Sequence, residues 1–359
     1  MAATRVLVVE DSPTVRERLR AVLAADPDID VVGEAGDGKR AIALCHELRP
    51  DVITMDMMLP IMSGVAATEY IMAHCPTPIV VVSSSLNRGE LFKTYEALAA
   101  GAVEVMGKPR GDDSDANWDR DFVSTVKLVS RIRVITHHRA RLRPSGYADR
   151  ATRSRPTPPP LRQGSYEVVA LGASTGGPGA IVSVLRSLPL TFSLPLLLVL
   201  HIGEPFGVAL ADWLDGQTGW RVHFARDSEP VGDSPGTVVM APPGRHLVVR
   251  AGRLHLTGDP ERHSCRPSVD VLFESVASEF GSAAAACLLT GMGRDGAAGL
   301  ASIHKRGGLT IAQDEATSVV YGMPREAVLL GAVEHVLPLD EIGPALATLV
   351  GRREGTRRP

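Results

Sequence analysis

The chain has 359 residues, a length that predicts two domains of ordinary size. Hydrophobic residues make up 44% of it, enough for two cores, and the formal net charge of −3 provides no general attraction to nucleic acids. The longest aliphatic run is too short to cross a membrane, and the first residues show no signal-peptide pattern. We therefore expect a cytoplasmic protein without direct membrane insertion, in which the scattered Cys45, Cys75, Cys265 and Cys287 are reduced thiols.

The first third of the chain alternates short apolar runs with segments of helical spacing. The runs are residues 4–9, 29–32, 51–55, 79–82 and 102–105, and the first two helical segments are residues 15–23 and 37–48. Continuous apolar runs are typical of strands that are buried on both faces. Their regular alternation with helices predicts an α/β domain with a five-stranded, doubly wound parallel sheet.

Charged and polar residues follow these strands. Glu10, Asp11 and Asp56 would bring three carboxylates together at the carboxyl edge of the sheet. Each acid alone would be read as a helix cap or a solvated loop residue, but three together repel one another unless a hard cation such as Mg²⁺ lies between them. Ser83 and Lys108 follow the fourth and fifth strands, where a hydroxyl and an ammonium group would face a bound phosphoryl group.

The motifs VVEDS, TMDMMLP, VVVSS and KP resemble the receiver domain of two-component response regulators, from residue 4 to about residue 123. The resemblance implies that Asp56 accepts phosphate from a histidine kinase, with Mg²⁺ as the cofactor. Many receivers carry an aromatic residue three positions before the lysine, where this chain has Val105. A rotating aromatic switch is therefore not expected here.

The segment after the receiver is rich in proline and arginine and has no apolar periodicity, which predicts a tether. A nucleic-acid-binding tail is the alternative, but Tyr147 is the one aromatic residue in residues 144–164 that could stack on a base. We expect no nucleic-acid partner. The predicted division is a receiver at 1–123, a linker at 124–163, a second domain at 164–351 and a tail at 352–359.

The second domain opens with an apolar run at residues 168–171, a glycine-rich turn and a predicted helix at 180–188. Gly172-x-Ser174-x-Gly176 matches the nucleophile-elbow pattern, in which a sharp strand-to-helix turn exposes a serine hydroxyl. Taken alone, the pattern more often marks a small residue in a tight strand-to-helix turn. A serine needs a base and an orienting group to act as a nucleophile.

Both groups are available at the ends of two further buried runs. His201 follows residues 194–200, and Asp295 lies in the glycine-rich loop after residues 283–290. Parallel strands bring their carboxyl ends to one edge, so Ser174, His201 and Asp295 are expected to meet there. The order Ser, His, Asp differs from that of the α/β-hydrolases, but a triad is defined by geometry and not by order.

The backbone amides of Thr175 and Met292 are our hypothesis for an oxyanion hole. A competing interpretation is a dinucleotide fingerprint, because the loop also reads Gly291-x-Gly293-x-x-Gly296 with Asp314 downstream. That fingerprint normally occupies the first strand-to-helix turn of its domain, and here it comes late. A response regulator whose second domain binds a nucleotide or nucleic acid is therefore the weaker alternative.

The rest of the domain is expected to complete a single sheet. The predicted strands are residues 237–241, 246–249, 253–256 and 309–312, the middle two forming a hairpin, and the predicted helices are residues 268–280 and 342–350.

The segments GASTGG, CRPSVDVLF, TGMGRDGAAGL and GGLTIAQDEATSVVYGMPREAV resemble the protein-glutamate methylesterases of bacterial chemotaxis, over nearly all of residues 166–350. The resemblance implies a Rossmann-like parallel sheet, with Ser174 as nucleophile, His201 as general base and Asp295 as the residue that orients it. It also implies γ-methyl esters of glutamate on chemoreceptor helices as substrate, glutamine deamidation in some relatives, no cofactor for the esterase, and a receiver that blocks the cleft until it is phosphorylated. The chain departs from the family in the residues IGEP after His201, where relatives commonly have a Met-Pro-rich turn.

Overall fold

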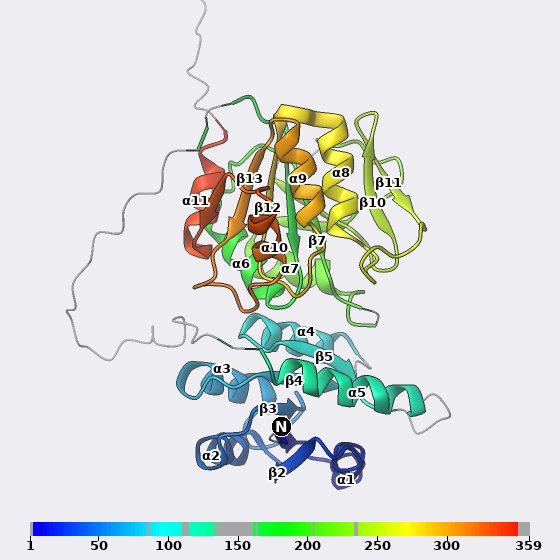
Figure 1. Ribbon diagram of the computed structural model, residues 1–359, viewed down its shortest axis with the longest axis vertical. Helices are drawn as coiled ribbons and strands as arrows, with labels where there is room; N and C mark the ends of the chain where they lie inside the picture. The colour runs from blue at the N-terminus through cyan, green and yellow to red at the C-terminus, as the bar shows by residue number, and fades with distance from the viewer. Residues whose placement is uncertain are drawn as a thin grey trace, which may run out of the picture. The chain divides into compact units, whose positions relative to one another are not determined.

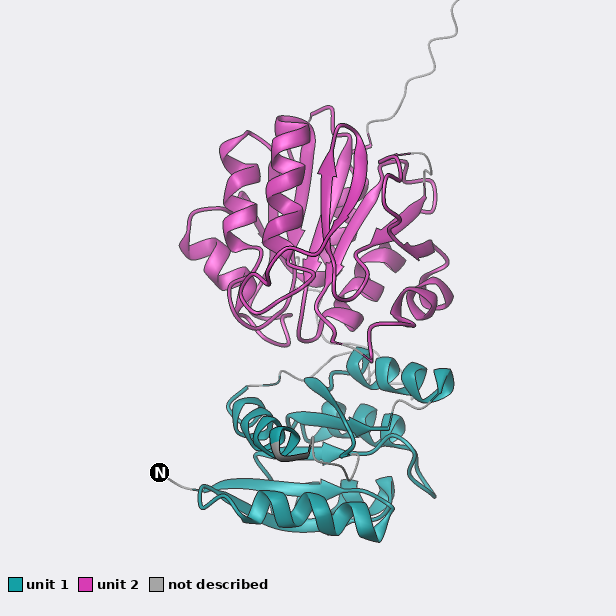
Figure 2. Ribbon diagram, turned by 90° about the vertical axis from the view of Figure 1, so that its right-hand side faces the viewer, with its two compact units in different colours: residues 1–149 teal, residues 150–359 magenta. Residues whose placement is uncertain are grey.

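The computed structural model describes residues 3–84, 87–109, 115–132, 134, 161–162, 164–203, 205–232 and 236–350. The chain forms two compact units, residues 1–149 and 150–359 (Figure 2). Residues 135–160, the greater part of the expected tether, and the expected tail at 352–359 lie outside the described residues. No helix in the described part of the chain is long and apolar enough to cross a membrane.

The first unit contains a five-stranded parallel sheet in the order β2-β1-β3-β4-β5, as predicted. Its strands are β1 (Thr4–Val9), β2 (Ile29–Ala35), β3 (Val52–Met55), β4 (Ile79–Ser83) and β5 (Glu104–Gly107). Its helices are α1 (Pro13–Ala24), α2 (Gly38–Leu48), α3 (Gly64–His74), α4 (Arg88–Ala99) and α5 (Asp115–Val129). Helices α1 and α5 cover one face of the sheet, where Leu19 and Phe122 pack into a core with the central strands.

The helices of this unit begin at polar caps. The side chains of Ser12, Asp37, Ser63 and Asn87 each accept a hydrogen bond from a backbone amide three residues ahead. Such caps satisfy amides that the first turn of a helix leaves without partners. They fix where each helix starts after a strand, and so keep the strand ends at one edge of the sheet.

The second unit contains a seven-stranded parallel sheet in the order β14-β13-β12-β6-β7-β9-β8 (Figure 1). Its strands are β6 (Val168–Ala173), β7 (Leu196–Leu200), β8 (Arg221–Phe224), β9 (Thr237–Met240), β12 (Ala284–Leu288), β13 (Leu309–Gln313) and β14 (His335–Leu337). Its helices are α6 (Gly177–Ser187), α7 (Leu210–Thr218), α8 (Val269–Phe280), α9 (Ala297–Lys305), α10 (Met323–Leu329) and α11 (Leu339–Ala347).

The prediction of a single sheet in this unit was wrong. The hairpin of β10 (His246–Arg250) and β11 (Arg253–Thr257) forms as expected, but as a separate two-stranded sheet. Strand β9 already pairs with β7 on one side and β8 on the other, so neither of its edges is open to the hairpin. Leu247 and Leu254 of the hairpin pack instead into a core with Phe273 of α8.

Gly176 makes the turn between β6 and α6 possible. Its φ is +76°, and a Cβ there would lie 2.6 Å from side-chain atoms of Val319. An L-residue is strained in this conformation, and the neighbouring side chain leaves no room for a methyl group.

We predict that Gly176→Ala lowers the free energy of unfolding by about 1–3 kcal/mol, from the left-handed strain and the contact with Val319. Gly216→Ala is the matched control, because it lies inside α7 and a Cβ there would have no heavy atom within 4 Å. This control should raise the stability by up to about 1 kcal/mol, since alanine favours helix more than glycine. Calorimetric unfolding of both variants is the measurement, and equal midpoints would contradict the role of Gly176.

Candidate active site and phosphorylation site

Ser174 lies between the end of β6 and the start of α6. Strand β6 occupies the middle of the seven-stranded sheet, between β12 and β7. The Ser174 amide donates to the carbonyl of Thr290 at 3.0 Å, and the Gly177 amide donates to the Ser174 carbonyl at 2.7 Å. These bonds fix the backbone of the turn while its side chain remains only partly buried.

His201 is the first residue after β7, the neighbour of β6. The two strands pair Ala173 with Leu200, and the His201 amide donates to the Ala173 carbonyl at 3.0 Å. Ser174 and His201 are therefore the first residues after two adjacent strands and lie at the same edge of the sheet, as expected from the sequence. The register of the parallel sheet is what brings them side by side.

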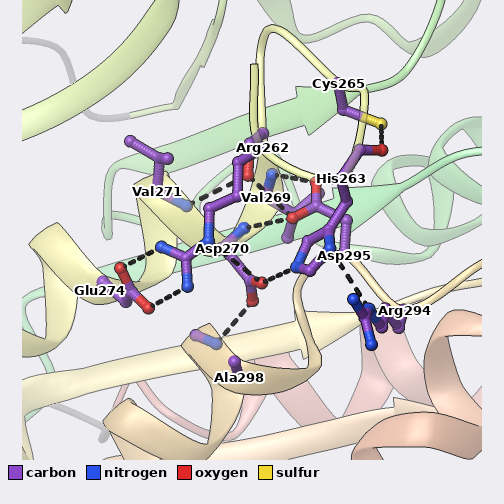
Figure 3. Close-up of polar contacts among 12 residues, drawn as sticks. Arg262, His263, Cys265, Val269, Asp270, Val271, Glu274, Arg294, Asp295 and Ala298 are labelled. Carbon is purple, nitrogen blue, oxygen red and sulfur yellow. Dashed lines mark hydrogen bonds and ion pairs between the residues drawn. The ribbon is translucent and has the colours of Figure 1, made fainter. Parts of the chain in front are cut away.

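Asp295 is buried and contacts His201 directly. Its Oδ2 lies 2.9 Å from His201 Nε2. The same carboxylate accepts hydrogen bonds from Ser268 Oγ at 2.8 Å, from the Val269 amide at 2.7 Å and from the Asp270 amide at 3.1 Å. Asp295 thus binds the first amides of α8, where the helix dipole favours a negative charge (Figure 3). Ser268, within CRPSVDVLF, is a site residue that the sequence analysis missed.

This arrangement sets the protonation of both groups. Burial alone would raise the pKa of Asp295, but the hydrogen bonds from His201, Ser268 and the Asp270 amide hold it below its usual value. Burial disfavours the imidazolium form of His201, yet the bonds to Asp295 and Cys265 outweigh it and raise the pKa of His201 to about 9. The pair therefore favours an ionised carboxylate beside an imidazole that carries a proton on both nitrogens below about pH 9, so His201 must lose its Nδ1 proton before it can act as a base.

An ionised Asp295 requires a proton on His201 Nε2, so Nδ1 is the nitrogen left to exchange a proton with a substrate or nucleophile. His201 Nδ1 lies 3.7 Å from the sulfur of Cys265. Among the residues that the structure describes, the Ser174 hydroxyl makes no hydrogen bond to His201. In this arrangement the nitrogen that Asp295 leaves free lies against the Cys265 thiol.

Both candidate oxyanion-hole residues belong to segments next to Ser174: Thr175 follows it directly, and a Cβ on Gly291, the residue before Met292, would lie 2.8 Å from the Ser174 Cβ. Neither the Thr175 amide nor the Met292 amide donates a hydrogen bond to any described part of the chain. Thr290 holds the backbone at Thr175 in place, because its hydroxyl donates a hydrogen bond to the Thr175 carbonyl at 2.9 Å. Both amides are therefore available to a ligand, and their role stays a prediction.

A second polar cluster supports the loop before α8 (Figure 3). His263 Nε2 lies 3.1 Å from Asp270 Oδ2, and Arg262 forms two bonds to Glu274 at 2.5 and 2.7 Å. Arg294 Nε donates to His263 Nδ1 at 3.3 Å. These contacts join the loop to both α8 and the segment that carries Asp295. The sequence analysis did not identify the cluster, because residue types and spacing do not show that the loop folds back onto α8 or that Arg294 joins it.

The glycines of the competing nucleotide interpretation have structural roles here. A Cβ on Gly296 would lie 2.6 Å from Leu288 and 2.7 Å from Val269, at the point where α9 begins. Asp314 Oδ1 accepts a hydrogen bond from the Thr317 amide at 3.0 Å and is thus engaged in its own turn. Close packing therefore accounts for Gly296 without a bound nucleotide.

In the first unit, the predicted acidic cluster forms at the carboxyl edge of the sheet. Oxygen atoms of Glu10, Asp11 and Asp56 lie within 4.8 Å of one another. Lys108 Nζ lies 2.9 Å from Glu10 Oε2 and 3.1 Å from Asp56 Oδ2. Ser83 is buried at the same edge, and its hydroxyl has no hydrogen-bond partner among the described residues.

These residues fit a hard divalent cation. Burial raises the pKa of Glu10 to about 6; the hydrogen bond to Lys108 opposes this shift and the charge of Asp56 adds to it. A donor set made only of carboxylate oxygens is the kind that such cations prefer. A cation would relieve the repulsion between Glu10 and Asp56 that one lysine only partly offsets.

Comparison with known proteins identifies both units. Residues 6–114 match the family model of the response regulator receiver domain, and residues 169–346 match that of the CheB methylesterase. A Nitrosospira multiformis protein named protein-glutamate methylesterase/protein-glutamine glutaminase is 44% identical over 98% of both chains. The chain belongs to this family. A second relative, of the same name and from Anaeromyxobacter dehalogenans, is 43% identical over 96% of both chains.

Among solved structures, the catalytic domain of the Thermotoga maritima CheB methylesterase is 35% identical, with a TM-score of 0.49. The match covers 52% of this chain and 100% of that domain.

We predict that Ser268→Ala lowers the free energy of unfolding by about 1–2 kcal/mol, because it removes both the cap of α8 and a bond to the buried Asp295. Ser302→Ala is the control, since this partly buried serine bonds, among the described residues, only to the Ala298 carbonyl of its own helix. Denaturant unfolding of the two variants tests the difference. A Ser268→Ala variant as stable as the control would show that the carboxylate does not depend on this hydroxyl.

Proposed function

We propose that this protein is a phosphorylation-activated serine esterase that hydrolyses γ-methyl esters of glutamate on the cytoplasmic helices of chemoreceptors, releasing methanol. It also deamidates glutamine at such sites, the second activity in its relatives' name. The observation that carries the proposal is the Asp295–His201 contact of 2.9 Å, adjacent to Ser174 in a methylesterase family member. The protein works in the cytoplasm, where a histidine kinase and the receptor helices are its partners.

In the first half of the reaction, His201 Nδ1 accepts the proton of Ser174 as the serine oxygen attacks the ester carbonyl carbon. The amides of Thr175 and Met292 stabilise the oxyanion that forms. Collapse of this intermediate breaks the bond to the methoxy group, which leaves as methanol with the proton from His201. Asp295 keeps the ring oriented and stabilises its charged form throughout.

In the second half, a water molecule gives a proton to His201 and attacks the acyl-enzyme. The proton then returns to the Ser174 oxygen, and the glutamate side chain is released as a carboxylate. A glutamine substrate forms the same acyl-enzyme with ammonia as the leaving group. One site therefore supports both activities in the relatives' name.

The receiver controls this site. Glu10, Asp11 and Asp56 would hold Mg²⁺, which when bound offsets the charge of the phosphoryl group that Asp56 accepts. Lys108 binds the transferred group and Ser83 donates its otherwise unpartnered hydroxyl to it. Binding of the phosphoryl group by Ser83 and Lys108 changes how strongly the receiver associates with the esterase domain. Because position 105 is valine, this change does not use a rotating aromatic side chain.

We predict that Ser174→Ala lowers turnover by roughly 10⁶-fold and leaves the fold intact, because the nucleophile is lost while the turn is kept. Ser302→Ala, which changes a partly buried helix serine in the same unit, should retain full turnover. The measurement is methanol release from methylated receptor, with circular dichroism to verify folding. Substantial methanol release by a folded Ser174→Ala protein would reject the nucleophile assignment.

Phosphorylation is predicted to raise the activity about 5- to 150-fold. This range corresponds to an unphosphorylated protein in which the state with the receiver blocking the esterase site is favoured over the open state by about 1–3 kcal/mol. Asp56→Asn should stay at the basal rate with or without a phosphodonor, whereas Asp30→Asn, an exposed receiver aspartate, should respond normally. A fragment beginning at Gly164 should be active without phosphate. Side-by-side methanol assays decide the matter, and a fragment no faster than the unphosphorylated full chain would exclude occlusion.

A further inference from the structure

Cys265 lies beside the catalytic base, although ester hydrolysis by Ser174 needs no thiol. It is partly buried, in a short loop closed by two backbone bonds with Arg262, at 3.1 and 2.9 Å. Its sulfur lies 3.7 Å from His201 Nδ1, the nitrogen that Asp295 leaves free. A fixed loop therefore holds a thiol against the one imidazole nitrogen that the reaction requires.

The spacing of these two atoms suits a tetrahedral metal ion. Zn²⁺ binds thiolate at about 2.3 Å and imidazole at about 2.0–2.1 Å, which places the two donor atoms about 3.5–3.6 Å apart at a tetrahedral angle. The observed 3.7 Å between Cys265 Sγ and His201 Nδ1 is close to that value. Little movement of either side chain would be needed to bind the ion.

Asp295 completes the arrangement from the far side of the ring. Histidine ligands of zinc usually donate their second ring N–H to a carboxylate, which fixes the ring and strengthens it as a ligand. Asp295 accepts this bond from His201 Nε2, and its position is fixed in turn by α8. Ligand atoms of Cys265, His201 and Asp295 all lie within 4.8 Å of one another.

We propose that Cys265 and His201 form a binding site for Zn²⁺ or a similar borderline-soft divalent cation, which inhibits the esterase by occupying Nδ1 of the base. Binding releases to solvent the thiol proton of Cys265 and the Nδ1 proton that His201 carries as an imidazolium, and the positions not filled by protein remain open to water. The inhibition rests on the proposed function, but the binding does not. Sulfur and imidazole donors select Zn²⁺ over Mg²⁺, the opposite preference to the all-carboxylate receiver site.

Binding is tested on the full chain with Co²⁺ as a spectroscopic substitute for Zn²⁺, in saturating Mg²⁺ to fill the receiver site. A thiolate-to-cobalt charge-transfer band should appear, disappear when Zn²⁺ is added, and be absent from Cys265→Ser. Cys45→Ser is the matched control, because the Cys45 sulfur lies 3.4 Å from the Cys75 sulfur and also offers a soft donor atom next to a second one. Absence of the band from the wild type, or its persistence in Cys265→Ser, overturns the site.

Inhibition is tested by methanol release, with each variant compared with its own metal-free rate. The Zn²⁺ concentration for half inhibition should rise at least about 10-fold in Cys265→Ser and stay unchanged in Cys45→Ser. Equal sensitivity of Cys265→Ser and the wild type overturns the inhibitory role. If the protein hydrolyses no ester, the proposed function fails, while the cobalt spectra still decide whether the site exists.

Discussion

The sheet edge that carries Ser174 and His201 depends on the hydrogen bonds that hold the buried carboxylate of Asp295. A buried charge costs several kcal/mol unless it is well paired, and here four donors surround it: His201, the Ser268 hydroxyl and the amides of Val269 and Asp270. Two of the donors are the first amides of α8, so the helix both neutralises the charge and is capped by it. Because the same carboxylate contacts His201, the position of α8 determines that of the base.

The two units apply the same geometric rule to different chemistry. In each, buried parallel strands end at one edge, and the residues just past those ends carry the reactive groups. The receiver collects carboxylates around Asp56, which suits a hard cation and a phosphoryl group. The second unit collects Ser174, His201 and Asp295, which suits acyl transfer. The sheet supplies the positions, and the residues at the strand ends decide the reaction.

Contacts on both ring nitrogens hold the imidazole of His201 in place. Asp295 fixes the tautomer, and the remaining nitrogen faces Cys265, not Ser174. The loop that carries Cys265 is held by the cluster of Arg262, His263 and Asp270. His201 is thus held on two sides, by Asp295 at Nε2 and by Cys265 at Nδ1.

The sequence by itself determined the α/β class, most of the strands, and the placement of Ser174, His201, Asp295 and Asp56 at the carboxyl ends of strands. It could do so because strands buried on both faces are continuous apolar runs, and because parallel strands align their carboxyl ends. Strands β8 and β14 and helices α3, α4, α7, α9 and α10 were not predicted. The two strands are short, partly exposed edge strands, so they form no continuous apolar run.

Only the tertiary structure decided how the groups at that edge contact one another. Sequence could not tell which nitrogen of His201 meets Asp295, that Ser268 donates to the same carboxylate, or that Cys265 lies 3.7 Å from the base. Nor could it show that β9, paired on both edges, excludes the β10–β11 hairpin from the main sheet. Each of these depends on side-chain rotamers and on contacts between segments far apart in the chain, whereas apolar periodicity reports only which face of an element is buried.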